Sequence, residues 1–513
     1  MLSNQSRLND RALSKEEVSQ RGRSPAFGHI VFIFAAGLPL VFFGAPVDPA
    51  LITPGLWAMN VVVLFWASLR LALILASGEI RLMMAMYWLF IYIAMAVVPM
   101  AQLHVGDWGR LMDPQTLITA QALALTASIA LDVGYATFRG KASLHPTGNT
   151  TSKLDRLVTL SRLRALSIAG VILAGLYIFT LGSVTVFFQT RLDRSSALED
   201  AGLKEDSLAA SSLLTALGTT PVFVALLLWT LFLLKRKVFR KSVEPWLWII
   251  CLLGLNIVVN NPLTNPRFWV LTLLLGFLFS LPSLTARRFR GIIVTGIIFA
   301  LVVFPYSDYF RVPEEFRGTM SFESVAETIA TKDFDQSTMT ANGIWWIDTV
   351  GHTLGQQLLG AVFFFIPRSI WPTKATDTGV VVGTAMNAPN TNLSSPLWLE
   401  VWVDFSWPGV IVAFVLLGML LRRCDASFNN RHDGFHQHIP LGSFLMPLIA
   451  GYSLIVLRGP LLQSMGRLLV LVMVCYVVTS SAAAYMAQRH ARPSQSRPER
   501  KLGGKRNPYL PTT

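Results

Sequence analysis

Six cationic side chains stand at or beside the ends of apolar segments, where a charge is costly and needs a partner. They are Arg267, Arg311, Arg317, Arg368, Lys374 and Arg458. Arginine suits phosphate, because its planar guanidinium donates two parallel hydrogen bonds and keeps its charge at any relevant pH. A single one of these cations is better explained by a neighbouring carboxylate or a lipid headgroup. The whole set predicts a shared anionic ligand.

The stretch FIPRSIWPTK, residues 365–374, places two of these cations around a stiff turn. Proline fixes φ, restricts the residue before it and lacks a backbone donor, so the two prolines predict a turn and not a helix. The tryptophan between Arg368 and Lys374 suits a membrane interface, where its ring lies at headgroup depth. We therefore predict that this turn forms one wall of the anion site.

Four side chains are candidates for a catalytic base, namely Asp335, His352, Glu400 and Asp404. Glu400 and Asp404 are four residues apart, so they share a helix face inside an apolar segment, where carboxylates are costly. Pairing with Arg267 or Arg458 is their structural alternative. Asp335 ends a D-x-D pattern that a solvated turn explains at least as well, and His352 is better explained as a structural histidine.

Composition identifies the elements that must position these residues. The chain has 513 residues, of which 53% are hydrophobic and only 14% charged, and its mean hydropathy is +0.51. A soluble domain carries about a quarter charged residues, so this composition predicts an all-α polytopic membrane protein. The net charge of +14 lies mostly in short segments between apolar runs, which indicates topology and not nucleic-acid binding. The three cysteines have no paired spacing, so neither a disulfide framework nor a thiolate metal site is predicted.

A membrane-spanning helix needs about 20 apolar residues, and this length predicts about twelve spans. They lie near 28–46, 54–77, 82–103, 115–138, 163–188, 208–234, 245–262, 266–284, 291–306, 396–421, 440–457 and 461–487. The predicted organisation is a basic tail (1–27), nine spans (28–306), a large loop (307–395), three spans (396–487) and a second basic tail (488–513). The first apolar run has no convincing cleavage site and is interpreted as an uncleaved signal anchor.

Charge sets the predicted orientation. With the N-terminus in the cytoplasm, the cytoplasmic side holds 31 of the 43 Lys and Arg residues and 10 of the 29 Asp and Glu residues. The opposite orientation would violate the positive-inside rule at every basic connecting segment. Both termini are therefore predicted to be cytoplasmic, and residues 307–395 to be extracytoplasmic.

The apolar stretch 343–367 inside this loop is long enough to cross a membrane. A crossing would place LRRC (421–424) and the basic C-terminal tail outside, so we predict an interfacial or re-entrant helix instead. Tryptophans cluster in and after it, at 345, 346, 371, 398, 402 and 407. They predict an interfacial belt first, and a stacking surface for sugar rings as the alternative.

These features together resemble the O-antigen or oligosaccharide repeat-unit polymerases (Wzy-type) of bacterial surface polysaccharides. The matching stretches are DFD (333–335), FIPRSIWPTK (365–374), NLSSPLWLEVWVDFSWPG (392–409) and VLRGPL (456–461). The similarity covers mostly residues 260–465. Ala375 departs from it, because a proline is the more usual residue there.

The resemblance implies a membrane-embedded glycosyltransferase of the C-type architecture in a bacterial inner membrane, active in O-antigen or exopolysaccharide biosynthesis. Such an enzyme transfers a growing glycan from undecaprenyl diphosphate to the non-reducing end of a lipid-linked repeat unit on the outer face. The implied partners are the undecaprenyl-diphosphate-linked oligosaccharide, the lipid bilayer and, as a candidate, a chain-length regulator. No metal or cofactor is expected. Clustered arginines would stabilise the leaving diphosphate, and one of the four candidate bases would activate the acceptor hydroxyl.

Two alternatives remain open. A lipid-linked glycan ligase would share the donor and differ in its acceptor. A flippase of lipid-linked oligosaccharides would carry charged residues along a path to both faces, whereas the unusual cations here gather on the predicted outer face.

Overall fold

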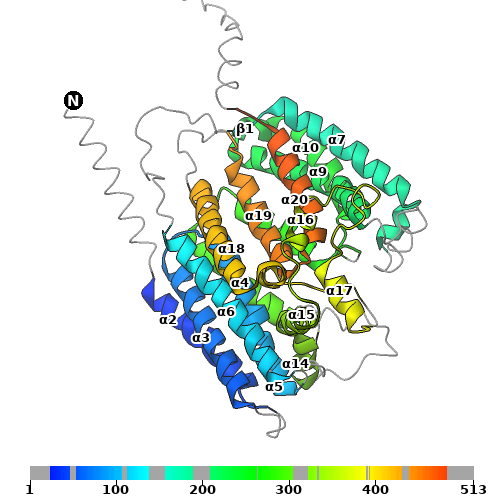
Figure 1. Ribbon diagram of the computed structural model, residues 1–513. Coiled ribbons are helices and arrows are strands. Elements are labelled where there is room, and N and C mark those ends of the chain that lie inside the picture. The colour runs from blue at the N-terminus through cyan, green and yellow to red at the C-terminus, as the bar shows by residue number, and fades with distance from the viewer. Residues whose placement is uncertain are drawn as a thin grey trace, which may run out of the picture.

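The computed structural model describes residues 24–46, 53–106, 113–137, 156–188, 208–262, 264–303, 322–331, 334–388, 391, 393–429 and 438–481. In these ranges the chain is helical apart from turns, loops and two short strands (Figure 1). The N-terminal helices are α2 (Pro25–Phe43), α3 (Pro54–Ala76), α4 (Leu82–Ile91), η2 (Tyr92–Val97), α5 (Val98–Val105) and α6 (Pro114–Thr137). The middle of the chain forms α7 (Leu160–Thr180), η3 (Val184–Phe188), α9 (Leu208–Lys235), η5 (Lys237–Lys241), α10 (Val243–Val259), α11 (Arg267–Ser280), α12 (Ala286–Ile298) and η6 (Phe299–Val303). The remaining helices are α14 (Phe322–Thr331), α15 (Gln336–Val350), α16 (Gln356–Val362), α17 (Thr378–Ala385), α18 (Leu397–Asn429), α19 (Gly442–Arg458) and α20 (Leu461–Val477).

Each apolar segment predicted from the sequence overlaps one of these helices or several in succession. The segment predicted at 461–487 is helical only to Val477, and the strand β2 (Thr479–Ser481) follows. Seven helices in the described ranges are long and apolar enough to cross a membrane. They are Pro25–Phe43, Pro54–Ala76, Leu82–Val105, Pro114–Thr137, Leu160–Thr180, Ser212–Lys235 and Leu397–Asn429. The expectation of an all-α protein that is embedded in a membrane is confirmed at this level.

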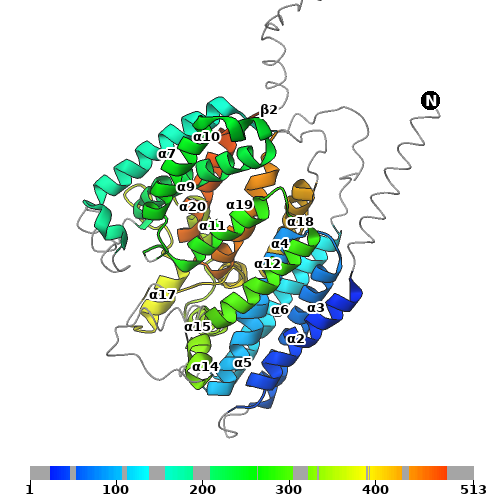
Figure 2. The same ribbon diagram turned by 180° about the vertical axis from the view of Figure 1, so that it is seen from behind.

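The helices pack as two bundles that share α11 and α19. One hydrophobic core joins α2 to α6 with α15 and α18, and a second joins α7, α9, α10 and α20. Residues of α11 and α19 belong to both cores, so these two helices form the seam of the molecule, as Figures 1 and 2 show. The closest pairing in the first bundle is α6 against α18, where Gly134 faces the carbonyl of Val415 and Gly418 faces that of Leu131. A side chain at either glycine would meet backbone, which is how small residues let membrane helices approach closely.

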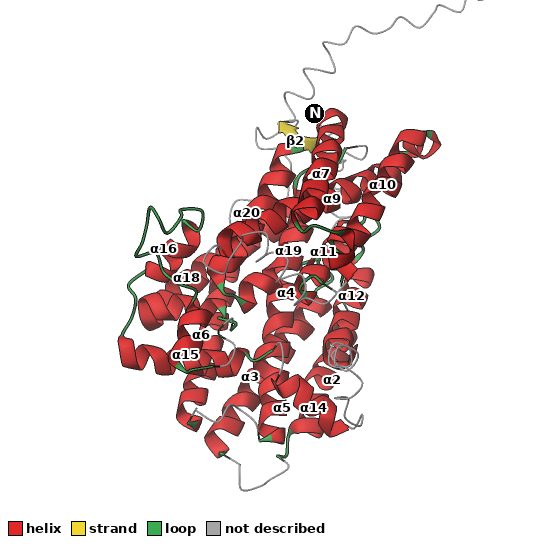
Figure 3. Cartoon of the chain, turned by 90° about the vertical axis from the view of Figure 1, so that its right-hand side faces the viewer, coloured by secondary structure: helices red, strands yellow, loops and turns green. Residues whose placement is uncertain are grey.

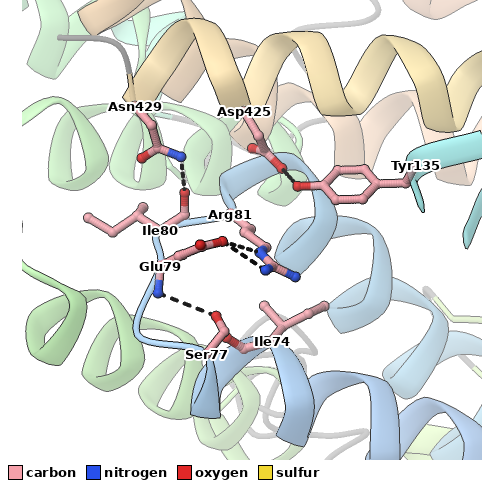
Figure 4. Close-up of polar contacts among 8 residues, drawn as sticks. All are labelled: Ile74, Ser77, Glu79, Ile80, Arg81, Tyr135, Asp425 and Asn429. Atoms are coloured by element: carbon pink, nitrogen blue, oxygen red, sulfur yellow. Dashed lines mark hydrogen bonds and ion pairs between the residues drawn. The ribbon is translucent and has the colours of Figure 1, made fainter. Parts of the chain in front are cut away.

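Polar contacts tie the first bundle together at the end where α18 finishes (Figure 4). Asp425 accepts hydrogen bonds from the Tyr135 hydroxyl and from the backbone N–H of Met83, both at 2.9 Å, so it caps the start of α4. About one turn further along, the Asn429 side chain donates to the carbonyl of Ile80 at 2.9 Å. These bonds join α18 to the turn between α3 and α4 and to α6.

An ion pair lies deeper in the same bundle. The guanidinium of Arg70 on α3 approaches Asp132 on α6 at 2.5 Å, and the indole N–H of Trp88 on α4 donates to the same carboxylate at 3.3 Å. Both charged groups are mostly buried, with 25% and 14% of the side chain exposed. Pairing is the expected arrangement for charges inside a membrane helix bundle.

The strands β1 (Arg156–Val158) and β2 (Thr479–Ser481) pair antiparallel, with Leu157 opposite Ser480. Leu157 also bridges to Pro440, just before α19. Three chain segments that are distant in sequence therefore meet at one end of the second bundle.

Two predicted helices are interrupted. The stretch 343–367 is not one helix, because α15 ends before Gly351 and α16 begins after Gly355, and both glycines have positive φ, 82° and 94°. Figure 3 shows α15 and α16 together on one side of the bundles. The segment predicted as a continuous span at 396–421 also breaks, at Ser406, where φ is 58° and ψ is −160°.

Candidate functional site

The segment 393–396, which leads into α18, contacts the surroundings of two predicted site residues. Ser394 donates a hydrogen bond to Asp335, and the carbonyl of Ser395 lies against Gly459, which follows Arg458. The predicted residues form an arginine group and a second group around Lys374 and Glu400. Arg311 and Arg317 lie outside the described residues, so the structure does not place them. The two groups are described in turn.

The arginine group lies at one end of the seam. Helices α11 and α19 run antiparallel, because Thr272 donates to the carbonyl of Gly451 at 3.2 Å while Gly276 packs on Leu448. This register brings Arg267, the first residue of α11, level with Arg458, the last residue of α19.

A third arginine joins this group and was not predicted from the sequence. The guanidinium carbon of Arg467 on α20 lies 4.2 Å from the centroid of the Trp269 ring. That of Arg458 lies 5.3 Å from the Phe268 ring. Guanidinium groups at such distances from aromatic faces make cation–π contacts. Arg458 and Arg467 therefore each contact a ring in the first turn of α11, the helix that begins at Arg267. The signal for Arg467 was its place inside an apolar helix, where arginine is rare.

Asp335 lies close to the arginine group. The Phe334 ring lies 6.0 Å from the Phe268 ring, edge to face. The Asp335 carboxylate accepts a hydrogen bond from the Ser394 hydroxyl at 3.0 Å and is half-buried. The next residue, Ser395, places its carbonyl against Gly459, which follows Arg458. A predicted base and the predicted anion ligands therefore share one end of the molecule.

An apolar cavity opens beside the same residues. It is lined by α4, η2, α11, α12, η6 and α19, and both Phe268 and Phe334 are among its lining residues. Nearly all of its surface is hydrocarbon, including Leu271 and Leu275 on the face of α11 that follows Phe268. The Phe268 ring therefore contacts Arg458 and also lines the apolar cavity.

Arg368 and Lys374 both make hydrogen bonds within their own turn. The guanidinium of Arg368 donates to the carbonyls of Lys374 and Ala375 and to the Thr376 hydroxyl, at 2.7, 3.1 and 3.2 Å. The ammonium of Lys374 is buried and donates to two carbonyls, those of Phe364 at 2.6 Å and Ile366 at 3.0 Å. Burial, reinforced by the charge of Arg368, lowers the pKa of Lys374. The predicted stiff turn is therefore present, and these two cations hold it together.

Glu400 lies behind this turn, beside a carboxylate that was not predicted. Its Oε2 accepts a hydrogen bond from the Thr378 hydroxyl at 2.7 Å, and the residue before that threonine is Asp377. Asp377 accepts from the Gln463 amide at 2.9 Å. Both carboxylates are almost fully buried, with exposed fractions of 3% and 2%. Burial raises the pKa of Asp377, against the opposing effect of the Gln463 hydrogen bond. Only the packing of α17 on α18 and α20 reveals this pair.

Asp404 and His352 form a third arrangement, at the break in α18. Asp404 accepts hydrogen bonds from the Thr353 hydroxyl and from the backbone N–H groups of Gln357, at 3.1 Å, and Leu358, at 2.8 Å. It therefore caps the start of α16. His352 Nδ1 lies 3.2 Å from the carbonyl of Val403 and its ring packs edge-on against Trp402. This geometry is that of a structural joint between α16 and α18.

The tryptophans divide into buried and accessible ones. Trp346, Trp398 and Trp402 are buried, whereas Trp345 and Trp407 expose 40% and 36% of their surface. Trp371 is half-buried. Only Trp345, Trp371 and Trp407 can therefore lie at a membrane interface or stack on a sugar ring.

No group of three or more His, Cys, Asp and Glu side chains comes together within the described ranges. Comparison of the chain with protein-family models, curated proteins and solved structures finds no match. The functional argument for this chain therefore starts from the geometry of its own residues.

Proposed function

We propose that this protein is a polysaccharide polymerase that acts on lipid-diphosphate-linked oligosaccharides at the outer face of a bacterial inner membrane. The observation that carries the proposal is that Arg458 and Arg467 both contact the first turn of α11, which begins at Arg267 and borders the apolar cavity at Phe268. A polyprenyl diphosphate has the matching chemistry, because it joins a doubly charged head to a hydrocarbon chain. Guanidinium groups are suited to the head, and the cavity is suited to part of the chain.

The proposed reaction uses the arginines to stabilise a leaving group. The acceptor hydroxyl attacks the anomeric carbon of the donor glycan, the bond from that carbon to the diphosphate oxygen breaks, and negative charge develops on the diphosphate. Fixed cations aimed at that charge lower the barrier, and removing one such group typically costs 10²–10³ in rate. Asp335 is the proposed base that takes the hydroxyl proton, because it is half-buried and follows Phe334, whose ring packs on the Phe268 ring that contacts Arg458.

The proposed topology follows from charge. All twelve predicted segments cross the membrane in this proposal, with both termini in the cytoplasm. Arg267 and Arg458 then lie at the extracytoplasmic ends of their helices, where a lipid-linked donor that has been moved across the membrane is accessible.

Reconstitution tests the proposal. Purified protein in liposomes, given undecaprenyl-diphosphate-linked repeat units and no added divalent metal, is expected to yield a ladder of longer lipid-linked glycans on gels. Arg458→Lys keeps the charge and removes the planar fork, so the rate is expected to fall about 10²-fold or more. Arg164→Lys is the matched control, because Arg164 pairs with Glu244 on the predicted cytoplasmic side at 2.6 Å. Its rate is expected to stay within twofold of the wild type.

Two outcomes would contradict the proposal. Transfer of intact substrate across the bilayer without any ladder would favour a flippase. A single transfer to a different acceptor without chain growth would favour a ligase.

A further inference from the structure

Three neighbouring residues behind the turn at 365–374 each carry a buried oxygen atom without a hydrogen-bond partner. The atoms are Asp377 Oδ1, Glu400 Oε1 and Ser395 Oγ, and none makes a hydrogen bond of normal geometry with the described residues. The three residues expose 2%, 3% and 0% of their surface. Leaving a buried polar atom without a partner costs about 1–3 kcal/mol, and more for a charged group. Three such atoms in one place therefore indicate a ligand that contacts all of them.

Neighbouring contacts hold the three atoms together. Thr378 links Asp377 to Glu400, because its hydroxyl donates to Glu400 Oε2 at 2.7 Å. The Ser395 hydroxyl and the backbone N–H of Leu461 both lie close to the Glu400 carboxylate, without the geometry of a normal hydrogen bond to its Oε1. Asp377 occupies the N-cap position of α17 but makes no side-chain hydrogen bond to that helix. Its carboxylate turns instead to Gln463 on α20, at 2.9 Å. An aspartate at an N-cap normally binds the first backbone N–H groups, so this orientation directs the second oxygen away from the helix.

The cations described near these atoms do not pair with them. Asp377 and Glu400 carry two negative charges when both are ionised. Arg368 and Lys374 both lie near Asp377, but their donors go to backbone carbonyls of the turn at 365–374. No described cation makes an ion pair with Asp377 or Glu400. The two carboxylates therefore lack a cation in direct contact, and a buried charge without a partner is costly.

We propose that Asp377, Glu400 and Ser395 bind one monovalent cation, Na⁺, as a structural ligand. Carboxylate and hydroxyl oxygens are hard ligands and suit hard cations, and the charges of Arg368 and Lys374 nearby favour a singly charged ion over a divalent one. The ion would hold the start of α17, the segment before α18 and the start of α20 together. This inference does not depend on the polymerase proposal, because it concerns the stability of the protein and not its reaction.

Thermal unfolding of the purified full-length protein tests the inference. The protein in detergent is held at constant ionic strength in choline chloride, and NaCl replaces choline in steps. A ligand that binds only the folded state raises the melting temperature as its concentration passes the Kd. We expect a saturable rise for the wild type and no Na⁺-specific rise for Asp377→Asn or Glu400→Gln. Asp348→Asn is the matched control, because Asp348 on α15 is exposed, and its response should equal that of the wild type.

A second variant covers the case in which the charge-removing variants fold poorly. Ser395→Ala removes one ligand and leaves every charge in place, so we expect it to fold and to need about tenfold more Na⁺ for the same rise. Three results would overturn the inference. The first is a wild-type melting temperature that does not change with Na⁺ concentration. If that temperature changes with pH alone, Asp377 and Glu400 share a proton and bind no cation. The second is a response to Ca²⁺ and not to Na⁺. The third is an equal response in all variants.

Discussion

Arg368 and Arg458 were both predicted to bind one anion, yet they use their guanidinium groups in different ways. Arg368 spends its donors on three acceptors of its own turn. Arg458 lies over the Phe268 ring beside an apolar cavity. Arg368 thus stabilises a turn, whereas Arg458 binds a diphosphate in our proposal.

Stability and ligand binding should separate these two roles. Arg368→Lys removes the fork that holds the turn, so we expect the free energy of unfolding to fall by about 1–2 kcal/mol. Arg458→Lys should change it by less and should weaken binding of a short-chain prenyl diphosphate. Thermal unfolding and equilibrium binding of that diphosphate measure the two effects. If Arg368→Lys binds the prenyl diphosphate more weakly and its stability is unchanged, Arg368 is part of the anion site.

The residues missed by sequence reasoning were missed for a physical reason. Asp377 reads as an ordinary polar residue of a loop, and its burial depends on contacts with α18 and α20, which follow it in the chain. Arg467 lies within the apolar helix α20, whereas the anion ligands were predicted from cations at the ends of apolar segments. The positive-inside rule places Arg267 and Arg458 on the same side of the membrane, so the sequence predicted that these two helix ends lie at the same depth.

At the scale of elements, the break in α18 explains how Asp404 and His352 are used. Ser406 has left-handed φ, so the regular backbone hydrogen bonds of α18 stop there. The carbonyl of Val403 accepts from the backbone N–H of Thr353 at 3.1 Å instead. Asp404 in turn caps α16. Residues at the break in α18 therefore accept hydrogen bonds from backbone N–H groups at and just before the start of α16.

This backbone geometry predicts the effect of a glycine. Ser406→Gly removes the strain of a side chain at φ 58°, so we expect the protein to gain about 1 kcal/mol in stability. Ser212→Gly is the matched control in α9, where glycine should cost about 0.5–1 kcal/mol. Thermal unfolding of both variants is the measurement. A loss of stability in Ser406→Gly equal to that in the control would show that α18 is continuous in solution.

Sequence patterns predicted the positions of helices better than their interruptions. Apolar length identified each long segment, because a run of about 20 such residues has few other stable uses. The breaks depended on single residues, Gly351, Gly355 and Ser406, whose backbone angles are fixed by neighbours from other elements. Only Pro408 and Gly409 after Ser406 hinted at the second break.

At the scale of the whole molecule, the arginine group lies at the seam between the two bundles, because α11 and α19 belong to both cores. A site at this position takes residues from both helix bundles, each of which has its own hydrophobic core. Small relative movements of the bundles would therefore change the distance of Arg467 on α20 from Asp335 on α15.

The proposed orientation can be tested with chemical labelling. Replacing the three free cysteines, Cys251, Cys424 and Cys475, by serine gives a background without thiols. In that background we expect an impermeant maleimide to label Asp348→Cys in intact spheroplasts. Lys241→Cys, in η5 at the predicted cytoplasmic end, should be labelled only after lysis. Both residues are exposed, so accessibility does not bias the comparison. The reverse pattern would invert the topology.

The pairing of α6 with α18 has a consequence for how the chain is made. About 260 residues separate the end of α6 from the start of α18. At roughly 5–20 residues per second, α6 waits on the order of ten seconds to a minute for its partner after it has been synthesised. The glycine face at Gly134 stays uncovered during this interval, while the pair between Arg70 and Asp132 can already form among the first helices. That early pair would keep two charged side chains satisfied during biogenesis, until the late helix arrives and closes the bundle.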